Sequence, residues 1–214
     1  MKLILRKMRL VVVAVGLAGF TAWAQASPIG DAVAGERKAS LCAECHGFDG
    51  NSMDANAPSL AGQYAGYIAK QVTDFQKGRR NNHASSSGGF EIEESEQDIK
   101  DISVYFSMQE MKGTPSKPNN DVVAVGEKLF REGNAKTGVY GCINCHGEKG
   151  MGKSAKVSTF PVIGGQHRDY LVNQLKGFRD GDRANDPAGM MAGVVKKITD
   201  KEIEAVAEYL SSQL

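Results

Sequence analysis

The sequence reads Cys42-Ala43-Glu44-Cys45-His46 in its first half and Cys142-Ile143-Asn144-Cys145-His146 in its second. Both stretches are Cys-x-x-Cys-His, the spacing at which a chain attaches a c-type haem. On a helical turn, side chains three residues apart share one face, so both thiols of a motif can reach one porphyrin. The histidine that follows can then turn its imidazole to the iron. The motifs therefore predict two haem c groups, haem 1 with His46 and haem 2 with His146 as proximal ligand.

The cysteine count supports covalent attachment. All four cysteines lie in the two motifs: Cys42, Cys45, Cys142 and Cys145. Haem attachment uses all four, whereas free thiols at this spacing in an exported chain would be oxidised. Paired cysteines also suit zinc, which is the alternative to haem. Because the motif occurs twice inside matched repeats, the dihaem interpretation is favoured.

The first 26 residues have the pattern of an export signal. The apolar run of residues 10–20 follows four basic residues, Lys2, Arg6, Lys7 and Arg9. Small residues at 24–26 offer a cleavage site, and the run is short for a membrane span, so an uncleaved anchor is only the alternative. We expect 1–26 to be a signal peptide and the protein to be periplasmic. The remainder has 22 Lys+Arg and 25 Asp+Glu, a formal charge of −3, which argues against a nucleic-acid partner.

The sequence around the motifs is repeated as well. A Pro-x-x-x-Gly-Gln pattern occurs at 58–63 and again at 161–166. A matched segment follows each copy, Tyr67 to Gln71 in one and Tyr170 to Gln174 in the other. We therefore predict two copies of one unit, with the boundaries 27–111 for domain 1, 112–120 for a proline-containing linker and 121–214 for domain 2.

Each unit is expected to be helical, because apolar residues recur at helical spacing and no segment alternates as a strand. The predicted fold is all-α, two tandem domains that each surround one haem. The expected helices cover residues 31–45, 64–77, 95–107, 121–132, 167–180 and 199–212. Ser95 and Thr199 are predicted N-caps, with Asp98 and Glu202 in the capping-box position.

The proximal histidines need an acceptor for the second ring nitrogen. Pro58 and Pro161 stand at matched positions and can fix a loop whose carbonyl accepts that hydrogen bond. The alternative is that the two prolines only shape a loop.

The distal ligand differs between the two units. In the second unit, Gly189-Met190-Met191-Ala192 lies between two predicted helices, in what we expect to be a glycine-rich loop. A thioether opposite histidine raises the reduction potential and suits electron transfer. We predict Met191 as the distal ligand of haem 2 and Met190 as its alternate, while filling of the core is the other interpretation of this pair.

The first unit has no methionine in the matched stretch, residues 83–89, where Ser87 or Gly88 stands in place of Met191. His83 in this stretch can reach the iron, although it can also be an ordinary loop histidine. The candidates for the sixth position of haem 1 are therefore His83, a methionine from elsewhere (Met53 or Met108), or an open or water-capped site that takes a small ligand.

These features together resemble the cytochrome c4 family, exported dihaem proteins built from two class I cytochrome c domains. The resemblance covers nearly the whole mature chain and rests on the two motifs, the Pro-x-x-x-Gly-Gln loops and the helices that follow them. The stretch with Arg183, Asn185 and Met191 also looks like the methionine-ligand loop of that family. The resemblance implies a periplasmic or membrane-associated electron carrier with His/Met ligation at both haems, from which this chain departs at Ser87 and Gly88.

We therefore predict an electron carrier and not an enzyme. Its expected partners are redox proteins, a terminal oxidase or a periplasmic oxidoreductase, and any membrane association would be through them. The chain supplies attachment, ligation and a low-dielectric pocket, while the cofactor does the redox chemistry. The alternative is a haem enzyme or redox-enzyme subunit in which haem 1 binds a small substrate and haem 2 relays electrons. No set of acid, base and substrate-binding groups accompanies the 83–89 stretch beyond His83.

Overall fold

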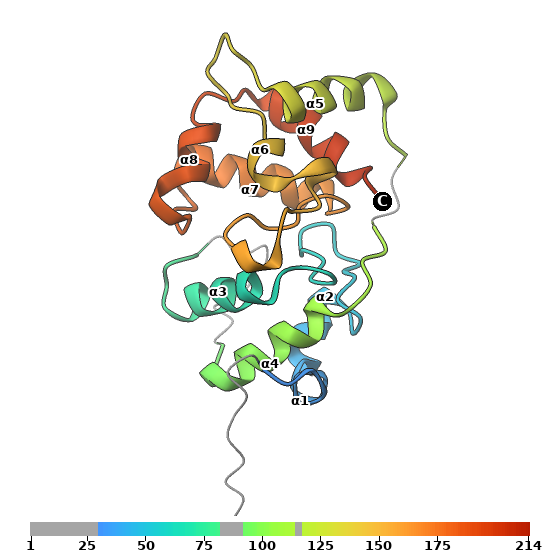
Figure 1. The fold of residues 1–214 in the computed structure, drawn as a ribbon, viewed down its shortest axis with the longest axis vertical. Helices are drawn as coiled ribbons and strands as arrows, with labels where there is room; N and C mark the ends of the chain where they lie inside the picture. Colours follow the sequence, from blue (N-terminus) through green and yellow to red (C-terminus); the bar gives the residue numbers. More distant parts are fainter. Residues whose placement is uncertain (1–29, 82–91, 114–116) are drawn as a thin grey trace, which may run out of the picture.

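The computed structural model describes residues 30–81, 92–113 and 117–214. These residues form two stacked halves, the N-terminal half (30–113) and the C-terminal half (117–214), each with its own helices (Figure 1). Within the described residues the chain forms no strand, and one isolated antiparallel bridge pairs Asn134 with Val139. The predicted all-α fold is confirmed.

The N-terminal half is built on helix α4 (Glu96–Ser107). Helix α1 (Ala32–Lys38) and helix α3 (Ala65–Gln76) both pack against α4, and helix α2 (Ser40–His46) continues from α1. Its small core contains Ala39, Ile68, Ile102 and Phe106.

The expectation of one helix over residues 31–45 was wrong. The chain breaks at Ala39, whose N–H bonds to the carbonyl of Glu36 three residues back rather than four. This tighter turn ends α1 and starts α2 in a new direction. The break lets α1 lie along α4 while α2 presents the first Cys-x-x-Cys-His motif.

The C-terminal half is built on helix α9 (Asp200–Ser211) in the same way. Helices α5 (Asn120–Glu132) and α7 (Arg168–Asp180) pack against α9, and the short helix α8 (Met190–Val195) packs against α7. The remaining elements are α6 (Ile143–His146) and three 3₁₀ turns: η1 (Glu148–Gly150), η2 (Ala155–Val157) and η3 (Pro187–Gly189). Its core is larger and includes Leu129, Phe130, Ile203, Val206 and Leu210.

Both predicted capping boxes are confirmed. The Ser95 hydroxyl accepts from the Asp98 N–H and the Asp98 carboxylate accepts from the Ser95 N–H. Thr199 and Glu202 repeat this arrangement at the start of α9. These reciprocal bonds satisfy N–H groups that a helix start leaves without partners.

Two glycines permit the main helix crossings. A Cβ atom added at Gly35 in α1 would lie 2.1 Å from the carbonyl oxygen of Asp101 in α4. A Cβ added at Gly126 in α5 would lie 1.9 Å from the carbonyl oxygen of Ala205 in α9. The paired helices therefore meet backbone to backbone, a contact that no pattern in the sequence indicated.

Several predictions fall outside the described residues: the signal peptide 1–26, His83 with Ser87 and Gly88, and linker residues 114–116. The linker was expected to extend to Asn120, but α5 already begins at that residue. The described helices include none that is long and apolar enough to cross a membrane.

Candidate functional site

Helix α2 carries the first Cys-x-x-Cys-His motif in the expected arrangement. Cys42 and Cys45 lie one turn apart, so their side chains share one face of the helix. His46 is the last residue of α2, and Gly47 ends the helix at a φ of 78°. A Cβ at Gly47 would lie 2.5 Å from the carbonyl oxygen of Asn51, so the turn after the motif requires glycine.

Helix α6 carries the second motif. Cys142 is its N-cap residue, Cys145 lies within it and His146 is its last residue. Gly147 then turns the chain at a φ of 75°. A Cβ added at Gly147 would lie 2.2 Å from the carbonyl oxygen of Gly152, so this turn also requires glycine. The two motifs therefore have the same local geometry although α6 is shorter than α2.

Each proximal histidine is held by the carbonyl of the matched proline. The Nδ1 of His46 lies 2.8 Å from the carbonyl oxygen of Pro58, and the Nδ1 of His146 lies 2.9 Å from that of Pro161. A carbonyl oxygen only accepts, so Nδ1 carries the proton in both rings. The expectation that the proline loops supply this acceptor is confirmed.

Burial favours the form of the imidazole that binds iron. Desolvation lowers the pKa of His46 and of His146, although the proline carbonyl works in the opposite direction in each. Both rings are therefore neutral at pH 7, with Nε2 left as a lone-pair donor. The donor set at each motif fits a haem iron.

The thiols also fit attachment to haem. Burial raises the pKa of the Cys42 thiol and of the Cys142 thiol to about 11, so neither is a thiolate at neutral pH. Cys142 packs beside the C-terminal core, and Cys42 packs beside the smaller core of the other half. A thioether carries no charge, and these apolar surroundings suit it better than an ionised sulfur. In the described part of the chain no three His, Cys, Asp or Glu side chains gather as a metal cluster.

The two candidate distal methionines of haem 2 lie at the start of α8. The predicted glycine-rich loop is wrong here, because Asp186 accepts the Ala192 N–H at 3.1 Å and helps to start a short helix. Met191 packs against the C-terminal core, whereas the Met190 side chain is 40% exposed. Of the pair, Met191 has the burial that suits a ligand.

The N-terminal half offers no such methionine at the two positions considered. Met53 is 91% exposed and Met108 is 71% exposed. Neither side chain is directed into the N-terminal core, and His83 lies outside the described residues.

Two buried arginines join the halves. Arg183 donates to Gln174 in its own half and to Tyr67 and Gln71 of α3, with Asn185 as a fourth partner. Arg80 repeats the pattern by donating to Gln71 in its own half and to Tyr170 and Gln174 of α7. Each guanidinium also stacks on an aromatic ring of its own half, Phe178 for Arg183 and Phe75 for Arg80.

The cluster formed by Arg80, Arg183 and their partners has a charge that suits a haem. The side chains of Gln71, Gln174, Asn185 and Tyr67, which accept from the Arg183 guanidinium, carry no formal charge, although Arg183 is only 4% exposed. A buried guanidinium with neutral partners suits a carboxylate, the group that haem carries on its propionates. Arg183 was expected only through the family resemblance, and Arg80 was not expected. The signal was their matched position in the repeat.

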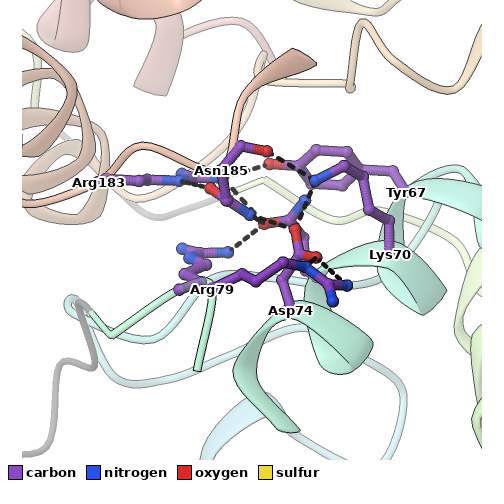
Figure 2. Close-up of polar contacts among 8 residues, drawn as sticks. Tyr67, Lys70, Asp74, Arg79, Arg183 and Asn185 are labelled. Carbon is purple, nitrogen blue, oxygen red and sulfur yellow. Dashed lines mark hydrogen bonds and ion pairs between the residues drawn. The ribbon is translucent and has the colours of Figure 1, made fainter. Parts of the chain in front are cut away.

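One carboxylate breaks the symmetry of the cluster. Asp74 pairs with Lys70 at 2.5 Å and Arg79 at 2.7 Å, and Asn185 donates to it from the other half (Figure 2). Burial alone would raise the pKa of Asp74, but the bonds from Lys70, Asn185 and Arg79 hold that pKa below its ordinary value. The aspartate therefore stays ionised at the junction of the halves.

A helical fold that twice places a neutral histidine behind paired cysteines belongs to the c-type cytochromes. The sequence profile of the family described as Cytochrome c matches residues 123–213, within the C-terminal half.

Comparison over the whole chain narrows this class. The chain is 40% identical over 193 residues to cytochrome c4 of Pseudomonas aeruginosa, covering 90% of this chain and 92% of that protein. The crystal structure of reduced recombinant cytochrome c4 from Pseudomonas stutzeri superposes with a TM-score of 0.74 at 39% identity, covering 86% of this chain and 100% of that one. The chain belongs to the cytochrome c4 family, and the resemblance noted from its sequence is confirmed.

A third relative has a different description. The thiosulfate dehydrogenase electron acceptor of Thiomonas intermedia is 35% identical over 193 residues, covering 89% of this chain and 82% of that protein. The relatives are thus electron-transferring cytochromes, which supports the expectation of a carrier rather than an enzyme.

Proposed function

We propose that this protein is a periplasmic dihaem cytochrome that carries electrons between redox proteins. The observation that carries the proposal is the duplicated proximal side, in which His46 and His146 each present a neutral Nε2 while a proline carbonyl holds Nδ1. Domain 1 (27–111) would hold haem 1 through Cys42, Cys45 and His46. Domain 2 (121–214) would hold haem 2 through its matched motif.

The haem iron supplies the redox chemistry by changing between its ferric and ferrous states. The residues of the chain set the conditions for that change. The proline carbonyls fix the tautomer of each histidine and make its ring a stronger donor. Met191 on α8 would be the distal ligand of haem 2, and its thioether would favour a high reduction potential. Arg183 provides positive charge for a propionate.

Two kinds of redox partner fit this role, a periplasmic oxidoreductase as donor and a terminal oxidase as acceptor. The relative described as a thiosulfate dehydrogenase electron acceptor supports the first kind. The basic and apolar pattern of residues 1–26, typical of an export signal, supports the proposed location in the periplasm.

A second function remains a candidate because of the distal side of haem 1. The stretch 83–89 contains no methionine, and Met53 and Met108 are both exposed. A first haem whose sixth position no side chain of the protein fills would bind a small molecule there, and haem 2 would then serve it as an electron relay.

The test uses the full chain, exported and loaded with haem. Two haems per chain by pyridine haemochrome, each cycling reversibly in a redox titration, are expected. Failure to bind two haems would contradict the proposal. Carbon monoxide is added to the reduced protein in the same experiment, and uptake at one haem would favour the second function.

A further inference from the structure

The Pro-x-x-x-Gly-Gln motif acts across the interface between the two halves. Its proline holds the histidine of its own half, but its glutamine reaches the other half. Gln166 accepts the Ser59 N–H on Oε1 at 2.8 Å and donates from Nε2 to the Ser59 carbonyl at 2.9 Å. Gln63 makes the same two bonds to Val162: its Oε1 accepts the Val162 N–H at 3.1 Å, and its Nε2 donates to the Val162 carbonyl at 2.7 Å. Each glutamine thus clamps one residue of the opposite proline loop.

The clamps are buried and fixed in orientation. Gln63 is 5% exposed and Gln166 is 4% exposed. Each Oε1 also accepts the N–H of the residue that follows its own glutamine, Tyr64 at 3.0 Å and His167 at 3.2 Å. Because each oxygen faces two N–H donors and each nitrogen faces a carbonyl, the amide orientation is determined by its partners.

Each clamped N–H belongs to the peptide group that holds a proximal histidine. The Ser59 N–H and the Pro58 carbonyl are the two ends of one planar amide, joined by resonance. The Pro58 carbonyl accepts from His46 and the Ser59 N–H donates to Gln166. The path from Gln166 to His46 is therefore two hydrogen bonds long, through a single peptide group.

The second path is the mirror of the first. The Val162 N–H, which donates to Gln63, shares a peptide group with the Pro161 carbonyl that accepts from His146. Hydrogen bonds at both ends of an amide polarise it, so a bond to the N–H makes the carbonyl a stronger acceptor.

We propose that Gln63 and Gln166 are crossed positioning residues, each tuning the proximal histidine of the opposite half. This inference rests on the proposed function, because it requires haem iron on both histidines. A stronger proline carbonyl draws the Nδ1 proton and makes Nε2 a stronger electron donor. That stabilises ferric iron and lowers the potential, so loss of a clamp raises the potential of the haem in the other half.

The test compares Gln166→Met with Gln63→Met, two substitutions of similar size that remove the amide. Midpoint potentials are measured on the haem-loaded full chain, and NMR assigns each to His46 or His146. Gln166→Met should raise the potential of haem 1 more than that of haem 2, and Gln63→Met should do the reverse. Asn173→Ala is the control, because it removes a bond between the halves, to Asn56, that involves neither Ser59 nor Val162.

The pattern of shifts decides between tuning and general loosening. Equal shifts at both haems, a larger shift in the variant's own half, or no shift would overturn the inference while two bound haems leave the proposed function intact. Gln166→Glu retains an oxygen acceptor for the Ser59 N–H and should leave haem 1 at or below its original potential. A rise equal to that of Gln166→Met would overturn the inference too.

A measurement on the unmodified protein guards against variants that fail to fold. In the ferrous protein, the amide protons of Ser59 and Val162 should exchange with solvent slowly, as should the Nδ1 protons of His46 and His146. Fast exchange of either amide would show that the clamp is not closed in solution and would overturn the inference.

Discussion

The two halves share their proximal sides but differ in what surrounds them. His46 and His146 meet proline carbonyls at almost the same distance, and Arg80 and Arg183 reach matched partners. The C-terminal half adds a larger core and a methionine packed against it. The N-terminal half has a smaller core and a carboxylate, Asp74, where the repeat has Gly177. Groups that hold the histidine and join the halves are thus duplicated, while the distal side and core have diverged.

The difference at the distal side predicts the largest effect. Met191→Ala should lower the potential of haem 2 alone by on the order of a few tenths of a volt, within the range of ~0.8 V that axial ligands span. A redox titration with spectroscopic assignment measures this. Met190→Ala is the matched control and should leave both potentials in place, because Met190 is exposed. Unchanged potentials in Met191→Ala would show that Met191 is not the distal ligand of haem 2.

The close helix crossings at Gly35 and Gly126 predict that the two halves lose similar stability when either glycine is replaced. Gly35→Ala and Gly126→Ala each force a Cβ against a backbone carbonyl, and we expect each to reduce the free energy of unfolding by about 3 kcal/mol. Denaturant unfolding followed by circular dichroism measures it. Gly193→Ala in α8 is the control, because within 4 Å of its added Cβ the described residues place no atom beyond its chain neighbours and the backbone of its own helix. A loss in only one half would show that the crossings are not equivalent.

Asp74, which stands where the C-terminal half has Gly177, predicts that stability depends on pH. The pKa of Asp74 is lowered, so its stabilisation is present above the ordinary value of 3.8 and is lost as pH falls through the folded-state pKa. Asp74→Asn should cost about 2 kcal/mol at pH 7 and flatten the acid limb of the stability profile. Unfolding at a series of pH values measures both. Glu96→Gln removes an ion pair with Lys100 that is exposed to solvent, and it should flatten the acid limb less than Asp74→Asn does because solvent screens that pair.

The matched capping boxes predict the smallest loss of stability, and one that is equal in the two halves. Ser95→Ala and Thr199→Ala each remove the side-chain acceptor at a helix start, and each should cost about 1 kcal/mol. Thermal unfolding of the two variants side by side gives the comparison. A much larger loss for Thr199→Ala would mean that the C-terminal half limits the stability of the whole chain.

Local signals in the sequence were enough for the parts of the site that depend on neighbouring residues. The motifs, the capping boxes and the proline carbonyls follow from spacing within a few turns of chain. The expected helix bounds were close, except where the turn at Ala39 split one helix and Asp186 helped to start another.

Contacts between the halves could not be predicted from the same signals. Nothing near Gln166 in the chain indicates that its side chain binds Ser59, since this depends on how two folded surfaces meet. The role of Gly126 likewise depends on the backbone of Ala205 in another helix. The repeat identified Gln63 and Gln166 as matched residues, but only the packed structure shows what they contact.

The glycine crossings also affect the order of events during synthesis. They join residue 35 to residue 101 and residue 126 to residue 205, so each core closes only when helices from both ends of its half are present. Closing such long loops is slow relative to forming local turns. As the chain emerges from its N-terminus, Cys42 and Cys142 therefore precede the helices whose residues form the cores they pack against. Each half has an interval in which the first cysteine of its motif is exposed because the core is still open, and the interval ends with α4 in one half and α9 in the other.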